Sequence, residues 1–133
     1  MHPIHQFMHC LNCGVCCTET EMLLSKEDIK RLEKRDFNQN QFVNYDKQGY
    51  AQLKNSNGHC VFYDLQNHKC KVYVDRPTGC RVYPVIVHEE KGIILDRLCH
   101  SRKSITLSEK KLKGKRVTKL LEIIDSEALE RFI

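Results

Sequence analysis

The sequence predicts an α+β fold that combines β-hairpins with an N-terminal helix and an amphipathic C-terminal helix. Three observations support this class: a helix-start pattern near residue 25, alternating β-branched and aromatic residues between residues 59 and 96, and a helical apolar repeat after residue 106. The chain has 133 residues, of which 41% are hydrophobic and 29% charged. This composition is typical of globular proteins, and the length suits a single domain over residues 1–133.

The first helix is predicted over residues 25–35. Ser25 and Asp28 match a capping box in which Asp takes the position usually held by Glu or Gln. Leu24 and Ile29 have the spacing of a hydrophobic staple, in which apolar residues on either side of the helix start pack together. These signals agree on Ser25 as the residue that caps the helix.

Two hairpins are predicted between the helices. The polar segment 38–41 is predicted to be a turn, and Asn57 followed by Gly58 is a strong turn signal. The strand segments that follow are residues 59–74, which form one hairpin, and residues 82–88 with 93–96, which form a second. Pro84 would confine its strand to the edge of a sheet, because proline has no N–H to donate to a neighbouring strand.

The last helix is predicted over residues 106–132. Thr106 and Glu109 match a capping box, and Gly114 weakens the first turns by up to ~1 kcal/mol relative to Ala. The following apolar residues recur at helical spacing and predict a buried face: Val117, Leu120, Leu121, Ile124 and Ala128. Residues 102–119 hold eight basic residues and one acidic residue, so this helix is also basic.

The compartment expected from the sequence is the cytoplasm. No apolar stretch approaches the roughly 20 residues that span a bilayer, so no membrane span is predicted. The first residues lack the cationic start and apolar run of a secretory signal.

Eight cysteines are the main chemical feature of the chain, far more than packing requires in a protein of this size. They form a tight quartet followed by four that are spread along the sequence: Cys10, Cys13, Cys16, Cys17, Cys60, Cys70, Cys80 and Cys99. The C-x2-C spacing lets successive sulfurs converge on one ion or cluster. Neighbouring residues rarely serve one tetrahedral ion, so the quartet should bridge two sites or one polynuclear site. Eight thiolates would complete two four-cysteine sites.

Two other roles for the cysteines remain open. Disulfides are less favoured, because nothing indicates export and closely spaced cysteines make awkward bridges. Burial as small hydrophobic side chains would suit Cys60, Cys70 and Cys99. A regular hairpin with its turn near residues 66–67 would place Cys60 opposite residue 73, ~10 Å from Cys70 along the strand. We therefore expect Cys60 and Cys70 to serve different sites.

Two motifs in the chain resemble a known family. Residues 10–17 fit C-x2-C-G-x-C-C, and residues 76–84 fit RP-x2-CR-x-YP around Cys80. With Cys99 the resemblance covers about residues 8–100. It is to the CxxCxxCC family of zinc- or iron-chelating domains, also called YkgJ-type cysteine-cluster proteins. The family occurs as small bacterial and archaeal proteins and inside flagellin lysine methylases. The resemblance implies that the cysteines bind metal, and it leaves the metal and any reaction open.

Arg76 and Arg81 flank Cys80 and have two plausible roles of equal weight. They could donate charge-assisted hydrogen bonds to thiolate sulfur and offset its charge, or they could be surface or structural arginines. Asp75 and Pro77 resemble a helix start, with Asp75 as the capping residue. Such a helix would place Cys80 near its N-terminus, where a thiolate is stabilised.

The leading hypothesis is a small cytoplasmic metal-binding protein whose thiolates hold zinc or an iron–sulfur cluster. One alternative is an iron–sulfur-dependent redox or methyl-transfer enzyme component, although the sequence contains none of the common nucleotide, metalloprotease or serine-hydrolase motifs. Enzymatic activity is therefore left undecided. The other alternative is a zinc-stabilised adaptor that binds nucleic acid through the basic C-terminal helix. It is not favoured, because the net charge of +5 would fall to about +1 with eight thiolates and two Zn²⁺ ions.

Overall fold

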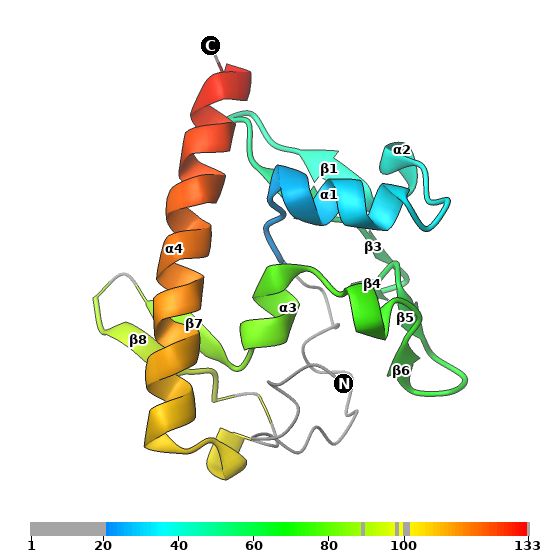
Figure 1. The fold of residues 1–133 in the computed structure, drawn as a ribbon. Helices are drawn as coiled ribbons and strands as arrows, with labels where there is room; N and C mark the ends of the chain where they lie inside the picture. Colours follow the sequence, from blue (N-terminus) through cyan, green and yellow to red (C-terminus); the bar gives the residue numbers. More distant parts are fainter. Residues whose placement is uncertain (1–20, 89, 98, 100–101, 133) are drawn as a thin grey trace.

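The computed structural model describes residues 21–88, 90–97, 99 and 102–132, and within them the predicted α+β class is confirmed. Short antiparallel hairpins and three helices lie beside one long helix, α4, which runs along one side of the molecule (Figure 1). The elements in order are α1 (Lys26–Glu33), α2 (Gln39–Phe42), β1 (Val43–Tyr45), β2 (Ala51–Leu53), β3 (Asn55–Ser56), β4 (His59–Cys60), β5 (Tyr63–Asp64), β6 (Lys69–Cys70), η3 (Tyr73–Asp75), α3 (Thr78–Val82), β7 (Val85–His88), β8 (Gly92–Leu95), η4 (Arg102–Ser104) and α4 (Leu107–Phe132). Of the helices in the described ranges, none has the length and apolar character needed to cross a bilayer.

Helix α1 begins as predicted and ends two residues earlier. The Ser25 side chain accepts a hydrogen bond from the Asp28 backbone N–H at 3.1 Å, and the Asp28 carboxylate accepts one from the Ser25 N–H at 3.2 Å. The predicted polar turn at residues 38–41 is wrong, because the short helix α2 begins there. Asn38 caps it and Gln41 returns a side-chain bond to the Asn38 N–H at 2.7 Å, a second capping box.

The turn at Asn57 and Gly58 is confirmed. Both residues have positive φ, 54° and 82°, as a two-residue turn of the I′ type requires, and β3 pairs with β4 across it. The next hairpin keeps the predicted register, but β5 and β6 pair over two residues each. The longer predicted hairpin is therefore wrong. Cys60 pairs with Asn55 in the preceding hairpin, and the chain beyond β6 turns into η3.

The hairpin β7–β8 is confirmed with a later start than predicted. Val82 ends α3, and strand pairing begins at Val85, after Pro84. The Asp96 N–H donates to the Pro84 carbonyl at 2.7 Å, so the ladder extends one bond past the paired strands. Proline accepts this bond without the N–H that an interior strand position would need.

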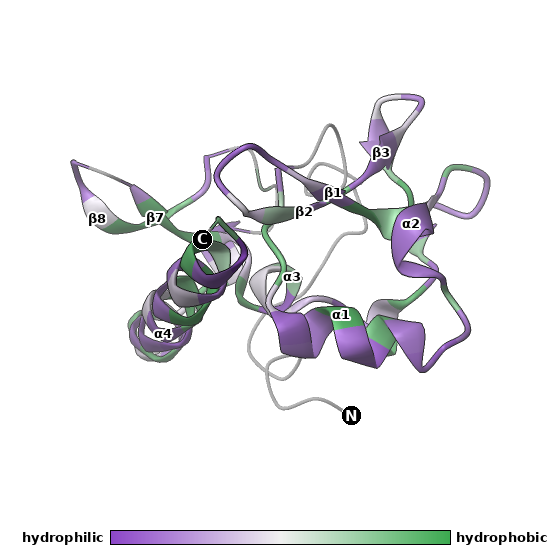
Figure 2. Ribbon diagram, turned by 90° about the horizontal axis from the view of Figure 1, so that it is seen from above, coloured by the Kyte–Doolittle hydropathy of each residue, from purple (hydrophilic) through white to green (hydrophobic). Residues whose placement is uncertain are grey.

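One buried cluster joins α1 to the central hairpins. Leu24, Ile29 and Leu32 pack with Phe42 and Val72 in this cluster, where each is less than 5% exposed. Seen from above, α1 and the β1–β2 hairpin lie on opposite sides of it, and mostly hydrophilic residues cover the outer side of α1 (Figure 2). Burial of the apolar side of α1 supplies most of its stability, since eight residues form a marginal helix alone.

The predicted C-terminal helix is confirmed as α4, and its buried face joins α3 and the β7–β8 hairpin. Val117 packs with Val82 and Val85 in a second buried cluster. Gly114 is buried beside Ile93, where an added Cβ would lie 3.0 Å from Ile93 Cγ2. Its lack of a side chain therefore has a packing reason that outweighs its lower helix propensity.

Candidate metal centre

Four of the eight predicted ligands lie in the described residues. Cys60 and Cys99 are 6% and 5% exposed, and Cys70 and Cys80 are half-buried. Cys60 belongs to the buried cluster beneath α1, and Cys70 and Cys80 pack against that cluster. The other predicted ligands lie outside the described residues: Cys10, Cys13, Cys16 and Cys17. The fold thus gathers at least three cysteines, 20 residues apart at the extremes, around one core.

Two strands and a helix hold three of these cysteines. Cys60 ends β4, Cys70 ends β6 opposite Tyr63, and Cys80 lies in the first turn of α3, where its N–H donates to the Pro77 carbonyl at 2.9 Å. The prediction that Cys80 lies near a helix N-terminus is confirmed. No disulfide joins any two of the four described cysteines.

The capping residue predicted for α3 is wrong. Asp75 lies in η3, and its carboxylate accepts a hydrogen bond from Arg35 at 3.0 Å. The first N–H of α3, from Thr78, donates instead to the carboxylate of Asp28 in α1 at 3.0 Å, and the Thr78 hydroxyl donates to the same oxygen at 2.9 Å. A carboxylate 50 residues away thus caps the helix that carries Cys80.

Asp28 connects α1 to the loop before Cys80. It is fully buried and also accepts a bond from the Arg31 guanidinium at 2.7 Å. Arg31 in turn donates to the Arg76 carbonyl at 2.8 Å. The sequence could show Asp28 as part of a capping box, but no local spacing signals its contact with Thr78. These bonds fix the backbone on the N-terminal side of Cys80.

Arg76 and Arg81 lie close together on this loop and on α3. The Arg76 guanidinium stacks on the Tyr73 ring, 4.0 Å from its centre. Arg81 donates to the Arg76 carbonyl at 3.1 Å and to the Val74 carbonyl at 3.2 Å. Burial lowers the pKa of the Arg81 guanidinium, and the nearby positive charges of Arg31 and Arg76 lower it further. Cationic groups near a helix N-terminus favour a thiolate over a thiol, so this neighbourhood suits metal-binding cysteine.

The segment that follows the cysteine quartet also contacts α3. The Met22 sulfur packs directly on Gly79, and a Cβ at Gly79 would overlap it. The Met22 carbonyl accepts from the Leu53 N–H at 2.9 Å, and Leu24 donates to the Ala51 carbonyl at 2.8 Å, so this segment pairs with β2. The chain is therefore anchored beside the helix of Cys80, five residues after Cys17.

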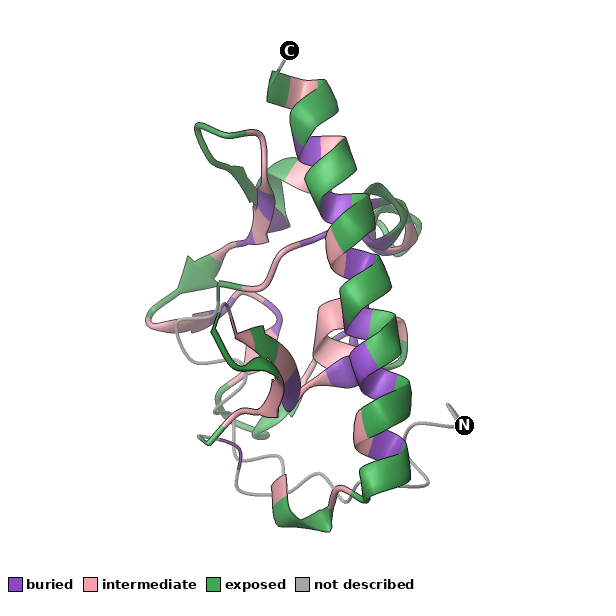
Figure 3. Cartoon of the chain, turned by 90° about the vertical axis from the view of Figure 1, so that its left-hand side faces the viewer, coloured by how far each residue is buried: buried purple, intermediate pink, exposed green. Residues whose placement is uncertain are grey.

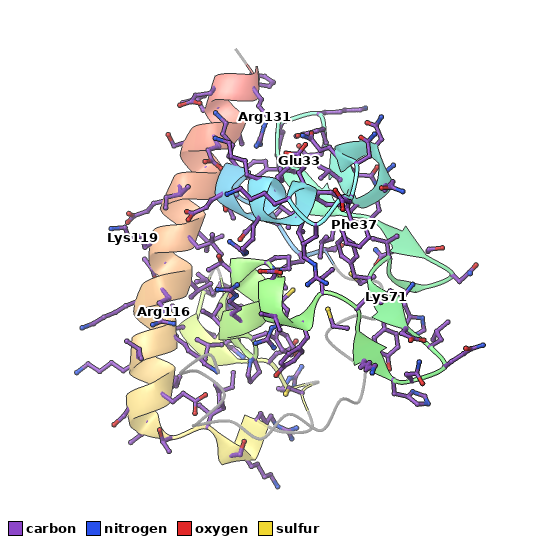
Figure 4. All side chains as sticks on the ribbon, turned by 45° about the vertical axis from the view of Figure 1, so that its right-hand side comes forward. Glu33, Phe37, Lys71, Arg116, Lys119 and Arg131 are labelled. Atoms are coloured by element: carbon purple, nitrogen blue, oxygen red, sulfur yellow. The ribbon has the colours of Figure 1, made fainter. Side chains whose placement is uncertain are left out.

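A complete metal site is not found within the described part of the chain, where no three Cys, His, Asp or Glu side chains come together. In Figure 4 sulfur atoms of the described residues lie in the neighbourhood of α3. Thiolate sulfur is the ligand that zinc and iron–sulfur clusters share, so the donor type fits both. The predicted division of Cys60 and Cys70 between two sites remains a prediction.

Comparison with known proteins identifies the family to which this chain belongs. A family model described as a "putative zinc- or iron-chelating domain" matches residues 9–100. The chain belongs to the CxxCxxCC family. A relative of this CxxCxxCC protein, an uncharacterized protein of Methanocaldococcus jannaschii, is 32% identical over 89 residues, which are 63% of this chain and 48% of the relative. The chain thus spans about half the length of that relative. No solved structure matches this CxxCxxCC protein.

Proposed function

We propose that this protein is a small cytoplasmic metal-binding protein whose eight cysteines hold zinc or an iron–sulfur cluster. The observation that carries the proposal is the packing of Cys60, Cys70 and Cys80 on one core, with Cys80 at a helix N-terminus between two arginines. The described cysteines do not complete a site among themselves. The remaining donors would come from the quartet, which the family motif identifies as the shared feature.

The first described residues of the chain lie beside α3. Met22 packs on Gly79, next to Cys80. The five peptide units between Cys17 and Met22 can span at most about 18 Å, so a site shared by Cys17 and Cys80 is compatible with the covalent chain. Cys80 is therefore the described cysteine best supported as a partner of the quartet.

Arg76 and Arg81 would stabilise the bound metal by charge. Four thiolates around Zn²⁺ carry a net charge of −2, and guanidinium N–H groups offset such a charge through hydrogen bonds to sulfur. We assign this role to both arginines because they flank Cys80 in the sequence and lie close together, with Arg81 donating to the Arg76 carbonyl at 3.1 Å. The metal itself would contribute much of the folding free energy, ~10 kcal/mol or more per zinc in small peptide models.

The experiment that tests the proposal measures metal and colour in the same sample. The full chain is purified without oxygen and examined by elemental analysis and absorbance. Stoichiometric zinc in colourless protein, or iron and sulfide with broad absorbance near ~400 nm, would support zinc or cluster binding respectively. Cys80→Ser should lower the metal content, whereas Val74→Ser, which removes an exposed side chain from the loop before α3, should leave it unchanged. Equal metal content in both variants would exclude Cys80 as a ligand.

Chelation tests the structural part of the proposal. Removal of the metal should lower the melting temperature and abolish the native circular dichroism, because the donors come from distant parts of the chain. Chelated protein that keeps both would contradict a structural role. A redox or methyl-transfer role would need an open coordination position, and activity of a metal-loaded sample would be the evidence for it.

A further inference from the structure

One flank of α4 is exposed along most of its length. Figure 3 shows α4 along the full height of the molecule, with exposed segments on the side that faces the viewer. Seven exposed residues recur every three or four positions and so share this flank, which we call the flank stripe: Leu107, Lys111, Lys115, Thr118, Glu122, Asp125 and Leu129. A groove of about 650 Å³ against Ile93 opens along its first half, and a hollow of about 480 Å³ beside Tyr50 opens along its second half.

Two copies of the flank stripe laid antiparallel, with the two Thr118 residues opposite each other, are nearly complementary in charge. Lys111 and Asp125 each lie seven residues from Thr118, on opposite sides, and Leu107 and Leu129 each lie eleven residues from it. In the antiparallel arrangement Lys111 of one copy lies opposite Asp125 of the other, and Leu107 lies opposite Leu129. This arrangement also brings Lys115 within one residue of the position opposite Glu122.

Three charged side chains of the flank stripe lack an ion-pair partner among the described residues. Among the described residues no ion pair includes Lys111, Lys115 or Glu122. Lys111 and Lys115 are spaced at i and i+4, where like charges destabilise a helix. The helix dipole does not explain the order either, because it favours acids in the N-terminal half and bases in the C-terminal half. The Tyr50 hydroxyl donates to Asp125 at 2.6 Å, and a carboxylate can accept several further bonds.

We propose that α4 packs antiparallel against α4 of a second copy of this chain, about a two-fold axis at Thr118. Each Lys111–Asp125 contact then occurs twice, as a two-fold interface requires. The leucines at the two ends meet each other, and the antiparallel arrangement opposes the two helix dipoles favourably. Charge complementarity of this kind fixes register and partner choice.

Nucleic acid fits this surface less well. The acidic half of the flank stripe would repel a phosphate backbone, and the described residues that line the groove include no aromatic side chain on which a base could stack. Figure 4 shows Arg116 and Lys119 also on α4, so its basic half extends beyond the stripe. The occupant best matched to both halves is a second copy of α4.

The test is sedimentation of the full, metal-loaded chain at low salt over a range of protein concentrations. The wild type should form a concentration-dependent dimer that weakens as salt rises. Two variants should each dissociate, with a dissociation constant at least about tenfold higher: Lys111→Glu with Lys115→Glu, and Glu122→Lys with Asp125→Lys. Mixed in equal amounts, these two variants should associate with each other, because their stripes then carry opposite charge.

A control variant with the same change in net charge separates the effect of the flank stripe from the effect of net charge alone. Lys30→Glu with Arg116→Glu changes two exposed basic residues outside the flank stripe, and this variant should dimerise like the wild type. Circular dichroism checks that every variant is folded. A wild type that is monomeric at all concentrations would overturn the proposal, even if it bound duplex DNA in a salt-dependent manner. Equal effects of the stripe and control variants, or no association of the mixed variants, would also overturn it.

Discussion

Replacement of Asp28 by Ala should destabilise the protein more than any other single change in α1. Asp28 is fully buried and accepts four hydrogen bonds: from the Ser25 N–H, the Thr78 N–H, the Thr78 hydroxyl and the Arg31 guanidinium. Loss of the α3 cap costs about 1 kcal/mol. Loss of the reciprocal bond from the Ser25 N–H costs about 1 kcal/mol more, while the Ser25 side chain still caps α1. A buried donor left without a partner adds roughly 1–3 kcal/mol. The free energy of unfolding should fall by about 3–5 kcal/mol, the range typical of a broken buried ion pair.

Urea unfolding followed by circular dichroism measures this change. Asp28→Asn should lie between Ala and the wild type, because the amide keeps one acceptor oxygen and loses the charge. Glu33→Ala is the control, since Glu33 is an exposed carboxylate on the same helix (Figure 4). Metal content should fall in the Ala variant, because α3 carries Cys80. If Asp28→Ala and Glu33→Ala unfolded within about 0.5 kcal/mol of each other, the capping role assigned to Asp28 would be refuted.

Three further predictions concern other parts of the fold. Glu109 and Lys113 form an ion pair at 2.7 Å, and both side chains are 1% exposed. Lys113→Met alone should lower the free energy of unfolding by about 3–5 kcal/mol, and the double variant with Glu109→Leu should recover most of that loss. If urea unfolding showed that the losses of the two substitutions add, this prediction would be contradicted. Gly79→Ala should destabilise by about 1–3 kcal/mol because its methyl group would overlap the methionine packed there, and a melting temperature equal to the wild type would show that the packing can adjust. A hydrogen bond from the Asn67 side chain lowers the pKa of Asp64 below 3.8. The bond therefore stabilises the hairpin above that pH, and this contribution is lost as the pH falls through the folded-state pKa of Asp64. An NMR titration of Asn67→Ala should show a higher pKa for Asp64, and an unchanged pKa would reject the assignment.

The features that the sequence predicts well are those decided by neighbouring residues. Ser25 with Asp28 and Asn57 with Gly58 act within four residues, so propensity and turn chemistry identify them. The extent of the hairpin after Cys60 was predicted less well, because Cys60 pairs with a strand on its N-terminal side. Local alternation alone cannot choose between two partners for one strand.

The candidate site shows the same division between local and distant causes. The motif around Cys80 is recognisable from its residues alone, and the helix start predicted near it is confirmed. Its cap was not readable, because Thr78 binds a carboxylate from another helix and Asp75 turns to Arg35. Helix propensity alone likewise marks Gly114 as a weak point, whereas its contact with Ile93 gives it a packing role. Contacts across 20 to 50 residues follow from packing, which the single sequence does not encode in any short pattern.

The pairing of residues 22–24 with β2 protects a vulnerable edge. Without that pairing, β2 would present open backbone N–H and C=O groups to other molecules, and exposed edges of this kind promote aggregation. A chain shortened to begin at α1 would lose this cover together with the buried Leu24 and the Ser25 cap. Such a chain should precipitate or self-associate on storage, so the pairing of residues 22–24 with β2 should contribute to solubility as well as to stability.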